Sequence, residues 1–130
     1  TRAFNAILEA NKLPTKDDRE IKIKEEAIKN ANELAFETPY HIASLCAEVL
    51  SLCVDLSKDG NPSSISDVGV AAESAYAGFK GATMNVLINM PNIENNDFRN
   101  KISNELKTKK SDVEASYKAT INEISRVLNT

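Results

Sequence analysis

The sequence of 130 residues contains no tryptophan and one histidine, and its aromatic residues amount to only 5% of the chain. Its lysines and arginines form no block with interleaved aromatic residues, and the net charge is -3. Because nucleic-acid-binding domains carry a basic patch, we expect no nucleic-acid partner. No uninterrupted apolar run approaches about 18 residues, so we also expect no membrane span and no membrane partner.

Cysteine is scarce as well, with only Cys46 and Cys53. In a helix, seven residues correspond to about 10 Å along the axis. A disulfide needs Cα atoms within about 7 Å, so these two thiols do not bridge each other. Two unbridged apolar thiols indicate a reducing compartment, and we expect a cytoplasmic protein. No cluster of ligands accompanies the cysteines, and His41 is interpreted as an ordinary helix residue, so we expect no metal and no bound cofactor.

What the sequence has in quantity is apolar residues at helical spacing. The pattern covers the first 13 residues, the stretch from the "TKDDRE" segment to Gly60, about Ser66 to Met90, and about Glu94 to Val127. No stretch alternates in the way of a strand. The sequence therefore predicts an all-α fold, an antiparallel up-and-down helical bundle of four to five long helices. Its length fits a single domain, residues 1–130.

Four residues predict where the helices begin and end. Pro14 ends the first helix, Thr15 can cap the second, and Gly60 can stop it. Pro39 lacks a backbone N–H, so either a kink or a fresh helix start with Thr38 as cap is expected there.

The segment "GNPSSISDVGVAA" begins as a loop and continues as a helix that has very little side-chain bulk. Gly69, Gly78 and Gly81 all fall inside this helix, although glycine there costs about 1 kcal/mol relative to alanine. Such a helix lets a neighbour come closer than a side chain permits, and that neighbour is either another helix or a flat ligand. One stripe of it carries Asp67, Ala71, Ser74, Gly78, Gly81 or Ala82, Asn85 and Asn89.

The polar residues of this segment have two interpretations. In the structural one, Ser64 and Asp67 form a capping box, and Asn85 and Asn89 bond to backbone groups. In the functional one, the "NPSSISD" loop and the two asparagines line a pocket at a helix N-terminus, where the dipole favours anions.

Taken together, the motifs resemble the formiminotetrahydrofolate cyclodeaminase family, which includes bacterial methenyltetrahydrofolate cyclohydrolases. The resemblance rests on "GNPSSISDVGVAA", "GATMNVLINM", "AFNAILEANKLP", "IKEEAIKNANELAFETP" and "NIENNDF", in this order along the chain. The family's Gly-rich loop has no counterpart here. Its proposed catalytic acid stands just before an Ala-Phe pair, which is Ala3-Phe4 here, so that acid would lie upstream of Thr1. We therefore expect a piece of a longer domain that lacks an N-terminal segment and is inactive alone.

The resemblance implies an ammonia-lyase of folate one-carbon metabolism and histidine degradation. It converts 5-formiminotetrahydrofolate to 5,10-methenyltetrahydrofolate and ammonia, so a tetrahydrofolate derivative is the expected substrate. A methenyltetrahydrofolate cyclohydrolase and a non-catalytic helical dimerisation module are the alternatives. A carboxylate can carry the proton transfers, and Asp67 is the candidate. The candidate substrate-binding residues are Asn61, Ser66, Asp67, Asn85 and Asn89 for the ring, and Lys12 and Lys24 for the folate tail. Since an apolar helix needs further cover, a homodimer is expected.

Overall fold

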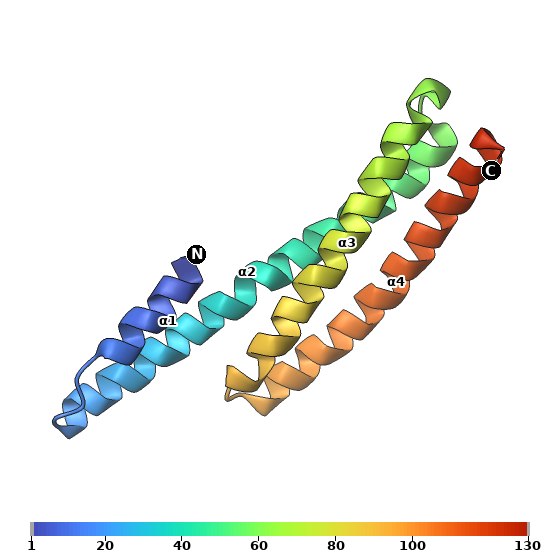
Figure 1. The fold of residues 1–130 in the computed structure, drawn as a ribbon. Coiled ribbons are helices and arrows are strands. Elements are labelled where there is room, and N and C mark those ends of the chain that lie inside the picture. Colours follow the sequence, from blue (N-terminus) through green and yellow to red (C-terminus); the bar gives the residue numbers. More distant parts are fainter. Residues whose placement is uncertain (1, 130) are drawn as a thin grey trace.

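The computed structural model describes residues 2–129, which are almost wholly helical and contain no strand. Figure 1 shows an elongated molecule of long helices joined by tight turns. The elements are α1 (Arg2–Lys12), α2 (Asp18–Asp59), the 3₁₀ turn η1 (Pro62–Ser64), α3 (Ile65–Asn89), the 3₁₀ turn η2 (Met90–Asn92) and α4 (Asn96–Leu128). The predicted all-α fold with long antiparallel helices is confirmed. What precedes Thr1 lies outside the described residues, and the assignment of one domain stays a prediction.

The longest helix, α2, supports all the others. α1 lies along its N-terminal half, while α3 turns back along its C-terminal half and α4 runs beside both (Figure 1). α1 packs mainly against α2, whereas α3 and α4 pack against α2 and against each other. At the end of the molecule that contains η1, the bundle therefore consists of α2, α3 and α4. At the other end, where α1 packs mainly on α2, the bundle is thinner.

The core consists of two clusters of buried side chains. One joins α2, α3 and α4 and contains Ala43, Leu50, Cys53, Ala72, Ala75, Phe79, Ala82 and Val113. The other lies near η2 and contains Phe36, Val86, Met90, Ile93, Ile102 and Leu106. Four of the eight residues of the first cluster are alanines, which lets the helices lie close together and leaves the bundle thin.

The start of α2 differs from the prediction. Asp17, not Thr15, is the N-cap, and its carboxylate accepts a hydrogen bond of 2.7 Å from the Glu20 backbone N–H. The Glu20 carboxylate in turn accepts from the Lys16 N–H at 2.8 Å. The prediction of Thr15 as cap is wrong. Asp17 accepts the hydrogen bond from the Glu20 N–H and also carries a negative charge, which the N-terminus of a helix favours.

The end of α2 agrees with the prediction. Gly60 is the C-cap and donates its N–H to the Leu56 carbonyl at 3.0 Å. A Cβ at Gly60 would lie 2.3 Å from that carbonyl oxygen, so the close approach of the two backbone segments requires glycine.

Pro39 does not interrupt α2, which continues unbroken through it. The Thr38 hydroxyl donates to the Leu34 carbonyl at 3.4 Å, and Thr38 caps no new helix, so the predicted fresh start is wrong. The Pro39 ring lacks the N–H that would bond to the Ala35 carbonyl. The Asn89 side-chain amide of α3 donates to that carbonyl at 3.3 Å instead. A contact from another helix thus replaces the hydrogen bond that the proline removes.

The three glycines of α3 have different surroundings. A Cβ on Gly78 would lie 2.9 Å from the Cys46 sulfur of α2, and one on Gly69 would lie 3.4 Å from Ile124 Cδ1 of α4. A Cβ on Gly81 would meet no atom of residues 2–129 within 4 Å. Close helix packing therefore accounts for Gly69 and Gly78 but not for Gly81.

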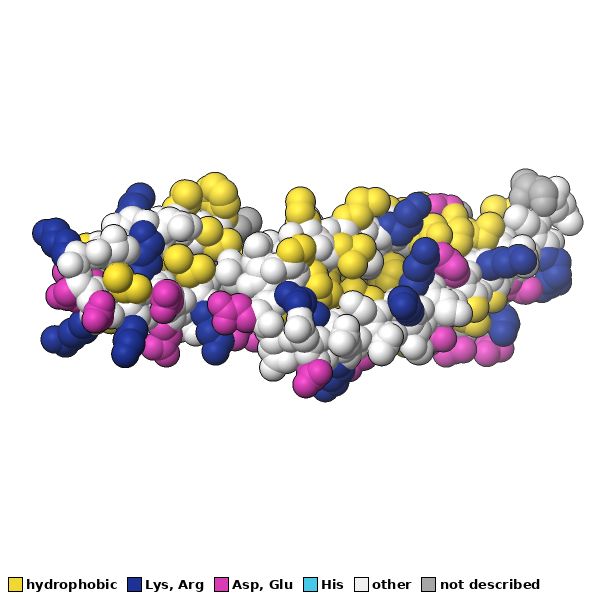
Figure 2. All heavy atoms as spheres, turned by 90° about the horizontal axis from the view of Figure 1, so that it is seen from below, with side chains coloured by type: hydrophobic (Ala, Val, Ile, Leu, Met, Phe, Trp, Pro, Cys, Tyr) yellow, Lys and Arg dark blue, Asp and Glu magenta, His cyan; other side chains and the backbone are white. Residues whose placement is uncertain are grey.

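Hydrophobic side chains reach the surface at many points along the molecule (Figure 2). Within residues 2–129, α2 contains an 18-residue window with mean hydropathy 1.3, which is long and apolar enough to cross a membrane. This finding rests on length and composition alone, so the expectation of no membrane span and no membrane partner stays a prediction. A core helix passes the same test, but only 22% of this window is buried.

Candidate functional site

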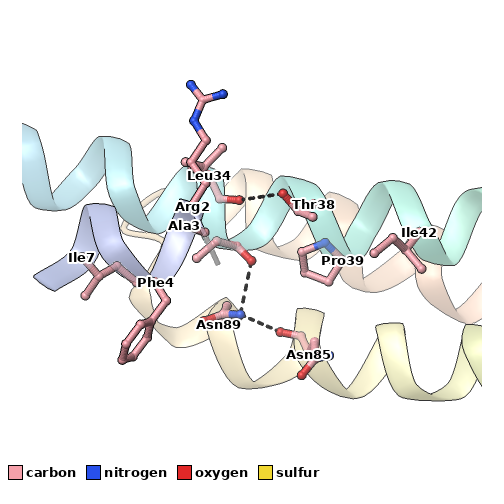
Figure 3. Close-up of a pocket in the computed structure, with 11 residues that line it drawn as sticks. Arg2, Ala3, Phe4, Ile7, Leu34, Thr38, Pro39, Ile42, Asn85 and Asn89 are labelled. Carbon is pink, nitrogen blue, oxygen red and sulfur yellow. Dashed lines mark hydrogen bonds between the residues drawn. The ribbon is translucent and has the colours of Figure 1, made fainter.

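A cavity lies where the N-terminus of α1 meets the middle of α2 and the C-terminal part of α3 (Figure 3). We call it the central cavity; its volume is about 540 Å³. Its walls are mostly apolar, and its lining residues are Arg2, Ala3, Phe4, Ile7, Leu34, Ala35, Thr38, Pro39, Ile42, Asn85 and Asn89. This volume falls in the range of small-molecule sites, roughly 300–1,000 Å³.

The two asparagines in the central cavity have different roles. The Asn89 amide donates to the Ala35 carbonyl and, at 2.8 Å, to the Asn85 carbonyl, so backbone groups occupy it. For Asn89 the structural interpretation therefore holds. The Asn85 side chain is exposed and makes no hydrogen bond within residues 2–129, which leaves its amide available to a ligand.

Arg2 is the only charged residue among the lining residues of the central cavity. Its guanidinium extends away from the two asparagines in Figure 3, so it lies at the cavity's edge. No carboxylate of residues 2–129 lines this space. These residues can therefore bind and orient a ring, but they provide no carboxylate to move a proton.

A second, smaller cavity lies at the opposite end of α3, beside the turn that joins it to α2. We call it the turn cavity; its volume is about 290 Å³, and it is lined by Cys53, Leu56, Gly60, Asn61, Ser64, Asp67, Val68 and Ala71. Asp67 is exposed in the first turn of α3. The predicted capping box is wrong, because Ser64 forms no side-chain cap hydrogen bond. Asn61 accepts from the Ser63 N–H at 3.0 Å, and Ser66 is exposed and does not line the cavity.

The predicted ring-binding residues do not form one site. Asp67 and Asn85 are 18 residues apart in one helix, which corresponds to about 27 Å. A pterin ring is far smaller than this distance, so it cannot contact both residues at once. Asp67, with Asn61, belongs to the turn cavity, whereas Asn85 and Asn89 belong to the central cavity.

The two lysines predicted for the folate tail line neither cavity. Lys12 forms an ion pair with Glu9 at 2.8 Å, and both side chains are exposed. Lys24 donates to the Asn11 carbonyl at 2.8 Å. Lys12 is in the last turn of α1, and Lys24 reaches that turn from α2. Both side chains therefore lie roughly 15 Å from the beginning of α1 at the central cavity.

Sequence reasoning missed a polar contact between α2 and α4. The Tyr40 hydroxyl donates to the Glu105 carboxylate, and the Tyr40 ring stacks on Phe36 with a centroid distance of 5.6 Å. Burial, followed by this hydrogen bond to a carboxylate, raises the pKa of Tyr40 to about 12. No local motif marks this pair, since its members are 65 residues apart.

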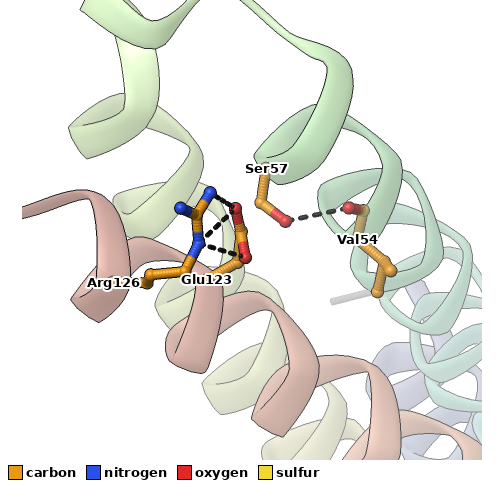
Figure 4. Close-up of polar contacts among 4 residues, drawn as sticks. All are labelled: Val54, Ser57, Glu123 and Arg126. Atoms are coloured by element: carbon orange, nitrogen blue, oxygen red, sulfur yellow. Dashed lines mark hydrogen bonds and ion pairs between the residues drawn. The ribbon is translucent and has the colours of Figure 1, made fainter.

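Burial raises the pKa of the Cys53 thiol, which makes it unreactive. On α4, Arg126 donates hydrogen bonds to the Glu123 carboxylate and thereby lowers the pKa of that carboxyl (Figure 4). On the neighbouring part of α2, the Ser57 hydroxyl donates to the Val54 carbonyl at 2.8 Å.

Within residues 2–129, no three His, Cys, Asp or Glu side chains are arranged to hold a metal ion. The absence of a bound cofactor stays a prediction.

The fold and the central cavity define an all-helical protein with a largely apolar cavity of small-molecule size. A family model described as formiminotransferase-cyclodeaminase matches residues 1–108. Among curated proteins, a methenyltetrahydrofolate cyclohydrolase of Methylorubrum extorquens is 35% identical over 104 residues, which are 80% of this chain and 50% of that protein. A formimidoyltransferase-cyclodeaminase of Mus musculus is 34% identical over 100 residues, 77% of this chain and 18% of that protein.

The chain therefore belongs to the formiminotransferase-cyclodeaminase family. This confirms the resemblance on which the sequence analysis relied. The chain spans half or less of the length of these relatives.

Proposed function

We propose that this chain is part of a folate-processing enzyme of one-carbon metabolism, and that its central cavity receives the ring of a tetrahydrofolate derivative. One observation carries the proposal: Ala3 and Phe4 form part of the wall of this cavity. In the family that the chain resembles, the proposed catalytic acid stands just before this Ala-Phe pair. This position supports the proposal, because an acid shortly before Ala3 would stand close to a ring bound in the cavity.

The walls of the cavity suit a flat ring with polar edges. Leu34, Ile7 and Ile42 offer apolar surface. The Asn85 amide, which forms no hydrogen bond within residues 2–129, offers an NH₂ group with two donor hydrogens and a carbonyl oxygen as acceptor. A site of this kind binds through apolar contact and uses a few fixed polar groups to orient the ligand.

The reaction that we propose is the cyclodeamination. N10 of the folate attacks the formimino carbon on N5, a tetrahedral intermediate forms, and ammonia leaves as 5,10-methenyltetrahydrofolate is produced. The attacking nitrogen loses a proton and the leaving nitrogen gains one, which a carboxylate within hydrogen-bond reach can mediate. Asp67, about 27 Å along α3 from Asn85, is too far from the central cavity to do so there. Hydrolysis of the methenyl compound is the second candidate, because the bacterial relative described above is named as a cyclohydrolase.

Binding of 5-formyltetrahydrofolate, a stable compound with a one-carbon group on N5, tests the central cavity. We expect calorimetry to detect binding to the 130-residue chain, and Asn85→Ala to weaken it roughly tenfold, the loss of one good hydrogen bond to a ligand. Asp67→Asn is the matched control and should bind as tightly as the wild type. Equal loss in both variants, or loss only in Asp67→Asn, would move the site away from the central cavity.

Two assays separate the reactions. Release of ammonia from 5-formiminotetrahydrofolate indicates the cyclodeaminase, and loss of the methenyl compound indicates the cyclohydrolase. A chain that binds no folate would favour a non-catalytic helical module.

A further inference from the structure

A third cavity, between α3 and α4, takes no part in the proposed folate binding. It lies between residues 76–87 of α3 and residues 110–114 of α4, two helices that run side by side (Figure 1), and its volume is about 380 Å³. We call it the α3–α4 cavity. None of its lining residues lines the central cavity or the turn cavity. It is therefore a separate space on another side of α3.

Apolar side chains form both the floor and the mouth of the α3–α4 cavity. Phe79 and Val113 lie at its floor, since they are only 2% and 1% exposed. Met84 and Leu87 are 64% and 54% exposed and stand at its mouth. A ligand with an apolar body would contact the floor and would also remove the two side chains at the mouth from water, which favours binding.

The charged residues that line the α3–α4 cavity leave an excess of one positive charge, because they are Lys80, Lys110 and Glu114. Lys110 forms an ion pair with Glu114 at 3.8 Å. Lys80 has no ion-pair partner within residues 2–129, and its Nζ lies 5.2 Å from the centroid of the Tyr76 ring. An anionic group on the ligand would therefore complement the charge near Lys80.

Thr83, which also lines the α3–α4 cavity, has a buried hydroxyl oxygen that forms no hydrogen bond within residues 2–129. Threonines in helices commonly donate to the carbonyl of the preceding turn. Thr38, Thr108 and Thr120 all do so in this chain. A buried hydroxyl without a partner costs free energy, which a polar group of a ligand would recover once the Thr83 side chain turns about χ1 towards the cavity.

We propose that the α3–α4 cavity binds a small aromatic carboxylate. The ring packs on Phe79 and Val113, and the carboxylate accepts from Lys80 and Thr83. An aromatic ring is favoured over an alkyl chain because the sulfur of Met84 makes favourable contacts with ring edges. The volume lies at the low end of the range for small-molecule sites, so the cavity fits one ring or two fused rings.

An NMR titration of the ¹⁵N-labelled 130-residue chain with naphthalene-2-carboxylate tests the proposal. The amide signals of residues 79–87 and 110–114 should shift and reach saturation. Those of α4 are decisive, because none of the described α4 residues lines the central cavity. Naphthalene-2-carboxamide has nearly the same shape but no charge, so it should bind about two- to fivefold more weakly, the effect of one exposed charge pair. Octanoate, which has an alkyl chain, should also bind more weakly.

Two variants and a matched control test the polar contacts. Lys80→Gln should raise the dissociation constant about two- to fivefold. Lys118→Gln is the control, since Lys118 is an exposed lysine of α4 that does not line the cavity, and it should bind as the wild type does. Thr83→Val keeps the side-chain volume and removes the unpaired hydroxyl. It should therefore raise the melting temperature and yet raise the dissociation constant about three- to tenfold, a combination that loss of packing does not produce.

Shifts that never saturate, or that leave residues 110–114 unchanged, would overturn the proposal. An unchanged dissociation constant in either Lys80→Gln or Thr83→Val would do the same, as would tighter binding of the carboxamide or of octanoate. The proposal does not rest on the folate function of the central cavity. Saturating 5-formyltetrahydrofolate should leave naphthalene-2-carboxylate bound, and its displacement would contradict two separate sites.

Discussion

At the scale of single residues, Asn89 shows how a side chain can look like part of a binding site and yet support the fold. Its amide donates to the carbonyl that Pro39 leaves without a partner, and it does so from another helix. The central cavity has both residues in its wall, so the contact also fixes the shape of the cavity. The same stripe holds Asn85, whose amide is not used in this way.

A double-mutant cycle tests this contact. Asn89→Ala should reduce the free energy of unfolding by about 1 kcal/mol, because the Ala35 carbonyl loses its donor. In a Pro39→Ala background the loss should be smaller, because residue 39 then has its own N–H for that carbonyl. Urea denaturation measures both effects. Asn85→Ala serves as the control and should change stability by less than about 0.5 kcal/mol. Equal losses with and without Pro39 would show that Asn89 acts in another way.

The sequence contained enough to place part of the candidate site. The separation of 18 positions between Asp67 and Asn85 already implied a distance of about 27 Å in a helix, so the two could have been assigned to separate sites before the structure was known. The role of Asn89 was not predictable in the same way. Its acceptor is 54 residues away, and only the packing of α3 on α2 brings the two together.

At the scale of helices, local signals predicted some ends and not others: Gly60 ends α2 as expected, whereas neither Thr15 nor Ser64 forms the expected cap. The end of α2 at Gly60 follows from the backbone geometry of that glycine, and the start of α4 follows from Asn95, which accepts from the Phe98 N–H at 3.0 Å. Pro39 was harder, because the local rule for a proline was offset by a tertiary contact. The helical face that packs inward was predicted from periodicity. Periodicity could not distinguish a face that packs within the chain from one left exposed, such as the α2 face with Ile42, Leu45, Val49, Leu52 and Leu56.

The contact between α2 and α4 through Tyr40 and Glu105 makes stability depend on pH. The unfolded chain loses the tyrosine proton near pH 10.0, whereas the folded chain holds it until about pH 12. The contribution of Tyr40 to stability is therefore complete below pH 10.0 and is lost as the pH rises towards about 12.

Comparison of the wild type with Tyr40→Phe isolates this contribution. We expect the wild type to lose stability relative to Tyr40→Phe over this pH range, as measured by urea denaturation at several pH values. Tyr117, whose pKa is also raised, mainly by its hydrogen bond to Glu73, is present in both proteins and cancels. A stability difference that does not change between pH 10 and 12 would show that Tyr40 titrates normally.

At the scale of the whole molecule, the helices differ in how firmly they are held. α3 has buried residues along its full length and packs on two helices, whereas Ala10 is the only buried residue of α1 within residues 2–129. α1 packs mainly on α2 and provides one wall of the central cavity. Segments with few buried apolar contacts open at lower free energy than the global unfolding. The wall of the proposed binding cavity is thus the part of the molecule that can move most easily.

Hydrogen exchange followed by mass spectrometry tests this difference. Backbone amides of α1 should exchange faster than those in the middle of α3, because α1 can leave α2 without disturbing either core cluster. Saturating 5-formyltetrahydrofolate should slow exchange in α1 if a ring binds between Phe4 and Asn85, and should leave the residues around Asp67 unchanged. Equal protection of α1 and α3 without ligand would show that α1 is held as firmly as the core. Slower exchange around Asp67 alone would place the ligand in the turn cavity, and a ligand bound there could not use the apolar wall that α1 provides.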